Sequence, residues 1–291
     1  MAQKKRVVKK IIEKYDVLVI GCGGTGTYFL KEFNHFLARN PGVQSKIDSL
    51  TIADGDAVEE KNLDRQAFLM EDVGRNKATV FAEILNDTMD GYNISASFRT
   101  RWAAYPSYIT SLEALKSVLK MKYVIAQEEY SSVTKTLTLK IPLIIGCVDN
   151  DAARMMCEEL FKSLPYCFYY DSGNDFSTGE VNYAHRFGGT TLSFEKSYSF
   201  RSMKTGDLRH VNELSCTELN ASAPQHFITN MTAAQWLLRG VVNMFGTDKS
   251  KGVLDNIQGQ LGYVFFDAFS GVSEFTERSY RTERNPDEKA S

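Results

Sequence analysis

The sequence predicts an α/β fold with a mainly parallel central sheet, extended by antiparallel strands in the C-terminal half. In the first half of the chain, short apolar segments alternate with segments of helical periodicity. A glycine-rich turn from Gly21 to Gly26 separates the first apolar segment from the first helical one. Beyond Gly179, strand-like segments follow one another with glycines between them, which favours antiparallel hairpins.

The first elements are predicted in the order strand, helix, strand. Residues 15–20 form an apolar run that ends at Gly21, and the segment TYFLKEFNHFLARN has apolar residues at helical spacing up to Pro41. SLTIAD is a second strand with an acidic end. NKATVFAEILNDTM then predicts a helix, and NISASFR alternates like a strand.

The alternation continues into the second half. ITSLEALKSVLKMKYVIAQEEYSS is predicted to be helical, and PLIIGCVDN is a buried strand that ends in polar residues. Helix DAARMMCEELFKSL and strand CFYYDSGN follow. VNYAHRF and TTLSFEK predict strands separated by Gly188 and Gly189, and HFITNMTAAQWLLRGVVNMF is the last long helix.

Composition excludes several classes of function. The 34 basic and 36 acidic residues nearly cancel, so the chain lacks the charge of a nucleic-acid or anionic-membrane binder. No stretch approaches the roughly 20 apolar residues of a membrane span. The five cysteines are scattered without a C-x-x-C pair, which predicts reduced thiols in the cytoplasm and no zinc site. Residues 1–14 form a basic segment expected to be a solvated helix, residues 15–274 one folded domain, and residues 275–291 a charged, disordered tail.

The glycine-rich turn is the first candidate binding site. At Gly21, Gly23, Gly24 and Gly26, missing side chains let backbone N–H groups and a helix N-terminus approach phosphate. Asp54 ends the second strand, where a carboxylate accepts hydrogen bonds from ribose hydroxyls. This pattern fits NAD as well as ATP.

The loop after Asp54 favours ATP. Within DGDAVEEKNLDRQAF and the following GRNKA stand the polar and charged residues Asp56, Asn62, Arg65, Gln66 and Lys77. An arginine and a lysine would neutralise triphosphate oxygens that an asparagine orients, whereas an NAD-dependent dehydrogenase does not need this set. At the end of the strand PLIIGCV, Asp149 and Asn150 occupy a ligand-binding edge, and the Asp149 carboxylate is a candidate Mg²⁺ ligand. Asp149 is also a candidate N-cap of the next helix.

These motifs, GCGGTG, DGDAVEEKNLDRQ, GRNKA and CVDN, occur here in the order found in the ThiF, MoeB and ubiquitin-activating-enzyme family, which the chain resembles from about Tyr15 to about Phe245. It is also similar to the ThiF-type component of bacterial PRTRC gene clusters. The resemblance implies a Rossmann-like adenylation domain and an adenylyltransferase of the ubiquitin-like-modifier-activating type. Its expected partner is a small β-grasp protein with a C-terminal glycine, and its expected state is a homodimer. By motif match, Asp54 would bind ribose, Asn62, Arg65 and Lys77 phosphates, and Asp149 Mg²⁺.

The sequence departs from the family in two places. The family's N-terminal R-Y-x-R-Q segment, which supplies an arginine to the neighbouring subunit, is replaced by QKKRVVKKIIEKY, where Arg6 is the candidate substitute. The zinc-binding C-x-x-C pairs are absent, and Cys216 in NELSCTELNASAP is a candidate reactive thiol or an ordinary one. An NAD-dependent oxidoreductase and an inactive nucleotide-binding half of a heterodimer are the alternative functions.

Overall fold

The fold is described from a computed structural model, for residues 8–92, 100–119, 127–130, 134–191, 225–246 and 261–277. Its strands are β1 (Val8–Ile20), β2 (Ile47–Ala53), β3 (Trp102–Tyr105), β4 (Gln127–Tyr130), β5 (Thr134–Gly146), β6 (Cys167–Asn174), β7 (Thr178–Phe187), β8 (Thr190–Thr191), β9 (Leu261–Asp267) and β10 (Ser273–Glu277). The helices are α1 (Gly24–Arg39), α2 (Pro41–Gln44), α3 (Lys77–Gly91), α4 (Leu112–Val118), α5 (Asp151–Ser163) and α7 (Phe227–Phe245), with short 3-10 helices η1 (Glu60–Asn62) and η2 (Met70–Asp72).

The strands form one mixed sheet in the order β10-β9-β7-β6-β5-β1-β2-β3, with β4 beside β5 and β8 beside β7. The pairs β1–β2, β1–β5, β2–β3 and β5–β6 are parallel, whereas β6–β7, β7–β9 and β9–β10 are antiparallel. The predicted parallel sheet with an antiparallel C-terminal extension is therefore confirmed.

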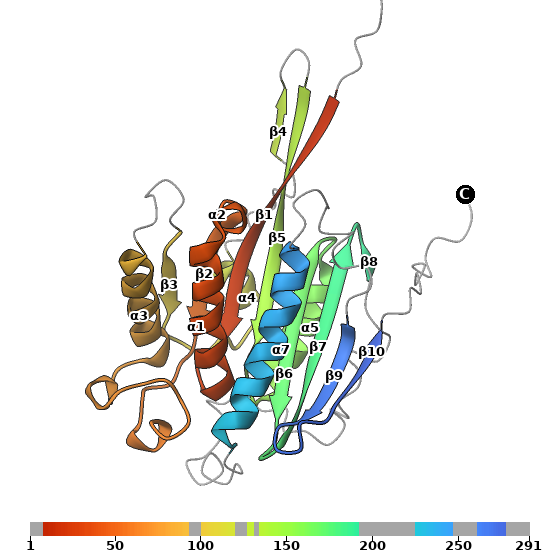
Figure 1. The fold of residues 1–291 in the computed structure, drawn as a ribbon. Helices are drawn as coiled ribbons and strands as arrows, with labels where there is room; N and C mark the ends of the chain where they lie inside the picture. Colours follow the sequence, from red (N-terminus) through yellow and green to blue (C-terminus); the bar gives the residue numbers. More distant parts are fainter. Residues whose placement is uncertain are drawn as a thin grey trace, which may run out of the picture.

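Helices cover both faces of the sheet, with α1, α3 and α7 on one side and α4 and α5 on the other (Figure 1). Strand β1 is buried between these layers, because Val17 and Val19 pack into the cluster under α1 while Leu18 and Ile20 pack into the cluster under α5. A strand that is buried on both faces reads as a continuous apolar run, which is why YDVLVI was recognisable.

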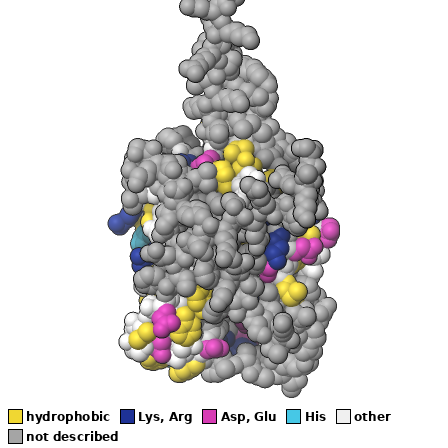
Figure 2. All heavy atoms as spheres, turned by 90° about the vertical axis from the view of Figure 1, so that its right-hand side faces the viewer, with side chains coloured by type: hydrophobic (Ala, Val, Ile, Leu, Met, Phe, Trp, Pro, Cys, Tyr) yellow, Lys and Arg dark blue, Asp and Glu magenta, His cyan; other side chains and the backbone are white. Residues whose placement is uncertain are grey.

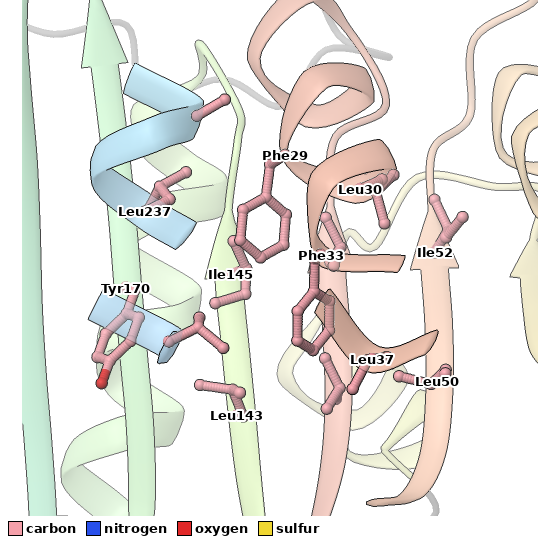
Figure 3. Packing of buried hydrophobic residues seen from close by; sticks show 14 of the residues in the cluster. Phe29, Leu30, Phe33, Leu37, Leu50, Ile52, Leu143, Ile145, Tyr170 and Leu237 are labelled. Atoms are coloured by element: carbon pink, nitrogen blue, oxygen red, sulfur yellow. The ribbon is translucent and has the colours of Figure 1, made fainter. Parts of the chain in front are cut away.

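Aromatic residues of α1 fill the larger core. Phe29 and Phe33 point from the helix toward Ile145 of β5 and Leu50 of β2, with Leu237 of α7 at the side (Figure 3). The two phenylalanine rings are stacked with their centroids 5.5 Å apart. Burying side chains of this size contributes about 1.5 to 3 kcal/mol each to the stability of the fold. Packing in this core therefore holds the first βαβ unit and α7 together.

Three local predictions are corrected, and a fourth, the strand NISASFR, falls on residues that the structure does not describe. Strand β1 begins at Val8, so the residues after 7 in the basic segment form a strand rather than a solvated helix; they pair with β5 from Val8↔Thr134 onward. In the described part of the predicted helix 109–132, α4 ends at Val118, and QEEY forms β4 because it pairs with β5. Strand β3 comes after NISASFR, which lies outside the described residues. Strand β10 continues to Glu277 through pairing with β9, so the first residues of the expected tail belong to the sheet.

The amino-terminal parts of β1 and β5 project with β4 beyond the body of the sheet (Figure 1). Pairing between β1 and β2 begins only at Tyr15. In the face that β9 and β10 border, acidic and basic side chains are mixed with hydrophobic ones in the described part of the chain (Figure 2). Among the helices of the described residues, none is both long enough and apolar enough to cross a membrane.

Candidate nucleotide-binding site

The candidate site lies where three parallel strands end side by side. Ile20 at the end of β1 is in register with Ala53 of β2 and with Gly146 of β5. The next residues are joined by backbone hydrogen bonds, from Gly21 N to Ala53 O at 2.9 Å and from Cys147 N to Ile20 O at 2.8 Å. The glycine turn, the Asp54 loop and the Cys147–Asn150 loop therefore meet at the carboxyl edge of the sheet, where α/β proteins bind ligands.

The four glycines of the turn serve different purposes. Gly21 has a φ of 92°, and a Cβ there would lie 2.5 Å from Cys147 O. A Cβ on Gly26 would overlap Gly21 O, and one on Gly24 would overlap the side-chain amide of Asn230. Only at Gly23 is space open, with Gln66 Nε2 the nearest atom at 3.9 Å. Gly23 is also the N-cap of α1 without a side-chain cap, so this is the position where an anion can approach the helix N-terminus.

Asp54 is fixed against the glycine turn. Its Oδ2 accepts a 2.6 Å hydrogen bond from Cys22 N, and its Oδ1 accepts a 2.8 Å bond from Asp56 N. Burial raises the pKa of Asp54 to about 6; Lys77 opposes this shift and Asp56 adds to it. Each carboxylate oxygen keeps a second lone pair, so the group can still accept hydrogen bonds from a ligand.

Lys77 is the buried cation of the site. It is the first residue of α3, only 6% exposed, and its Nζ lies 3.0 Å from Asp56 Oδ2. Asn76 caps the helix through a 3.0 Å bond from Thr79 N, while its amide nitrogen donates to the carbonyl oxygens of Asp54 and Asp56. The cap thus ties the start of α3 to the end of β2.

Asn62, Arg65 and Gln66 lie in the segment between the Asp54 loop and α3. Asn62 is buried, and its Oδ1 accepts from Glu59 N at 3.0 Å, so this side chain caps η1. Gln66 is also buried, faces Gly23, and its Oε1 has no hydrogen-bond partner among the described residues. Arg65 is half-buried, and its backbone N–H bonds to Asn62 O at 3.1 Å. Among these three residues, Gln66 is therefore the one that the structure brings directly to the glycine turn.

Asp149 is exposed after the end of β5. The N-cap of α5 is Asn150, whose side chain accepts from Ala153 N at 3.1 Å, so the prediction that Asp149 caps this helix is wrong. No group of three or more His, Cys, Asp or Glu side chains gathers into a metal cage within the described ranges. A single exposed carboxylate nevertheless fits Mg²⁺, which is held by one or two protein carboxylates together with substrate phosphates.

Sequence reasoning missed two residues that organise this edge. Arg154 of α5 is buried and bonds to Val148 O, to Ser172 O at 3.1 Å and to the Asp171 carboxylate at 3.3 Å. Tyr108, from the loop after β3, donates its hydroxyl hydrogen to Asp56. The bonds of Arg154 to Ser172 and Asp171 and the bond of Tyr108 to Asp56 join separate elements of the fold, and no local pattern signals them.

The described cysteines are unsuited to nucleophilic chemistry. Cys22, Cys147, Cys157 and Cys167 are free thiols, and burial raises the pKa of each one above its ordinary value. A protonated thiol is a weak nucleophile. Cys216 and Arg6 lie outside the described residues.

Solved structures with this fold include complexes of MccB. The chain is 17% identical to E. coli MccB in a structure with AMPCPP and MccA, with a TM-score of 0.55, covering 94% of this chain and 65% of that one. The microcin C7 biosynthetic enzyme MccB in complex with N-formylated MccA gives 17% identity and a TM-score of 0.58, covering 93% and 67%. PaaA gives 19% identity and a TM-score of 0.50, covering 92% and 65%.

The chain thus spans about two thirds of the length of these structures. At such identities the likeness shows the shared fold alone. A family model described as the ThiF family, by contrast, matches residues 4–272, nearly the whole sequence. The chain therefore belongs to the ThiF family.

Proposed function

We propose that this protein is an adenylyltransferase that uses ATP to activate the C-terminal carboxylate of a peptide or small protein. The observation that carries the proposal is the register of β1, β2 and β5, which brings the open Gly23, the Asp54 carboxylate and the exposed Asp149 to one edge. Lys77 adds a buried cation at the same edge. Together these groups are suited to bind a ribose, a polyphosphate and a divalent cation.

In this proposal each part of ATP has its own partners. The ribose hydroxyls would donate to Asp54, whose oxygens are held in place by Cys22 N and Asp56 N. The phosphates would lie over Gly23 and Gln66, with Arg65 and Lys77 neutralising their charge. Asp149 and the phosphate oxygens would hold Mg²⁺, which supplies further charge neutralisation when bound.

The proposed reaction forms one bond and breaks one. An oxygen of the substrate carboxylate attacks the α-phosphorus of ATP, and the bond between that phosphorus and the bridging oxygen of pyrophosphate breaks. The products are an acyl adenylate and pyrophosphate, and no thiol takes part. Catalysis of this kind rests on positioning and on stabilising the charge that moves onto the leaving pyrophosphate.

We further infer that the substrate is a small β-grasp protein with a C-terminal glycine and that the enzyme is a cytoplasmic homodimer. The length of β1 supports a homodimer in which the N-terminal segment of one subunit contributes to the site of the other. From Val8 to Ile20 the strand spans about 40 Å at roughly 3.3 Å per residue. Arg6 precedes Val8 by two residues in the sequence, and two residues span at most about 7 Å of chain, far less than the length of β1. Any role of Arg6 in catalysis would therefore be at the site of a second subunit.

Two measurements test the proposal. Calorimetry should show that the protein binds ATP with Mg²⁺ more tightly than NAD. Tight NAD binding without a response to ATP would instead support an oxidoreductase. Exchange of labelled pyrophosphate into ATP should then require a β-grasp protein ending in Gly-Gly. The same protein with an amidated C-terminus is the control, since it lacks the attacking carboxylate. ATP binding without exchange for any free carboxylate would indicate an inactive nucleotide-binding subunit.

A further inference from the structure

Asp56 stands between two donors from different parts of the fold. Its Oδ2 pairs with Lys77 Nζ at 3.0 Å, and its Oδ1 accepts the hydroxyl hydrogen of Tyr108. The backbone of Asp56 is held too, because its N–H bonds to Asp54 Oδ1 and its carbonyl accepts from Lys77 N at 2.9 Å. Both oxygens of this carboxylate are therefore occupied by donors in the absence of any ligand.

Tyr108 reaches Asp56 from the edge of the sheet. Its loop is tied to the end of β2 by the bond from Asp54 N to Tyr105 O at 3.2 Å. The ring lies against Gly55, where an added Cβ would be 2.6 Å from Cγ and Cδ2 of the ring and 2.7 Å from Cδ1. Burial and the hydrogen bond to Asp56 raise the pKa of the Tyr108 hydroxyl, so it stays a proton donor.

The charges at this edge of the sheet explain why the hydrogen bond from Tyr108 to Asp56 matters for anion binding. Asp54, Asp56 and Asp149 are acidic, whereas Lys77 is the buried cation among them. A polyphosphate brought here must share the Lys77 ammonium with Asp56 and is repelled by that carboxylate. A hydrogen bond from a hydroxyl spreads part of the carboxylate charge onto the donor, which weakens both effects.

We propose that Tyr108 is a positioning residue that tunes Lys77 for an anionic ligand by holding and partly neutralising Asp56. The proposal rests on the proposed function in so far as the ligand is the triphosphate of ATP. Without the hydroxyl, the full charge of Asp56 bears on Lys77 and on the ligand. The affinity for polyphosphate then falls, although Tyr108 itself touches no phosphate.

Inorganic tripolyphosphate is a probe that separates this proposal from the adenylation reaction, because its binding needs no carboxylate substrate. Calorimetry should show binding to the wild-type protein and a loss of about fivefold to tenfold in Tyr108→Phe, of the order expected for one hydrogen bond to a charged group. Tyr105→Phe, which changes a half-buried tyrosine at the end of β3, just before the loop that carries Tyr108, should stay within about twofold. Thermal melting checks that the variants fold.

Two further variants decide the mechanism. Gly55→Ala keeps the hydroxyl but displaces the ring, so it should weaken tripolyphosphate binding as Tyr108→Phe does. In an Asp56→Ala background, Tyr108→Phe should have no further effect, because no carboxylate remains to be neutralised. An undiminished Tyr108→Phe effect in that background would overturn the proposal, and so would a wild-type protein that does not bind tripolyphosphate. Loss of pyrophosphate exchange alone, with this pattern intact, would count only against the proposed reaction.

Discussion

Asn230 of α7 packs directly on Gly24, the first residue of α1, although the two are far apart in the sequence. The Asn230 side chain is 0% exposed, and its Cγ lies 2.6 Å from where a Cβ on Gly24 would stand. Its Oδ1 accepts hydrogen bonds from Thr25 Oγ1 at 3.3 Å and from Asn174 Nδ2 at 3.2 Å. Gly24 is therefore needed for helix packing, whereas Gly23 borders open space.

This difference predicts that substitutions of two neighbouring glycines affect different properties, protein stability in one case and ATP binding in the other. Gly24→Ala should destabilise the protein by about 1 to 3 kcal/mol, because the added methyl group overlaps a buried side chain. Gly23→Ala should leave stability nearly unchanged and weaken ATP binding. Urea unfolding and calorimetry measure the two quantities. Equal losses of stability in both variants would contradict the assignment.

Arg154 is predicted to hold the loop that carries Asp149. Arg154→Met removes the bond to Val148 O and the ion pairs with Asp151 and the buried Asp171, which should cost about 3 to 5 kcal/mol of unfolding free energy. Adding Asp171→Asn should recover part of that loss, because a buried carboxylate that has lost the Arg154 guanidinium is replaced by a neutral amide. Arg186→Met is the matched control, since Arg186 bonds to Leu164 O on a different segment. Additive losses for Arg154→Met and Asp171→Asn would show that the two residues are not coupled.

The raised pKa of Asp54 predicts a pH dependence of stability. Its pKa is about 6 in the folded protein against an ordinary 3.8, so between those values the folded state binds more protons than the unfolded state. Its contribution therefore becomes less favourable as pH rises from about 4 to 6 and costs on the order of 2 to 3 kcal/mol above that range.

Urea unfolding between pH 4 and pH 7 measures this dependence. The stability of Asp54→Asn minus that of the wild type should rise with pH over this range, on top of a constant offset from the changed hydrogen bonds. Asp64→Asn, which changes an exposed carboxylate in the next loop, is the control for the loss of one acidic side chain. A flat difference for Asp54→Asn would mean that the Asp54 pKa is not raised.

Cys216 is predicted to be dispensable for adenylation. Attack of a carboxylate on phosphorus uses no thiol, so Cys216→Ala should retain pyrophosphate exchange within about twofold. Any loss should appear in a later transfer of the activated carboxylate. A collapse of exchange in a folded Cys216→Ala protein would assign the residue to the first step.

Local sequence patterns predict the parts of this protein whose structure is decided locally. YDVLVI and the glycine turn identify the first strand and helix, because burial on both faces and the missing side chains leave a mark in the sequence. The strand QEEY has no such mark, since it forms only through pairing with β5. The contact of Tyr108 with Asp56 is equally invisible, because the fold alone brings the two segments together. Sequence reasoning could therefore nominate Asp54, Asp56 and Lys77 but not Tyr108, which donates a hydrogen bond to Asp56.

Isotope exchange between pyrophosphate and ATP measures the proposed transfer of AMP to a carboxylate at this edge of the sheet. With a glycine-terminated β-grasp protein as substrate, Arg65→Ala and Asp149→Ala should each lower the exchange rate on the order of a hundredfold to a thousandfold. Arg65 is half-buried and Asp149 exposed, so neither substitution opens a core cavity and unfolding free energies should stay within about 1 kcal/mol of wild type. Asp64→Ala is the control and should keep the wild-type rate. Near wild-type exchange in folded Arg65→Ala or Asp149→Ala would show that the proposed site is not where AMP is transferred.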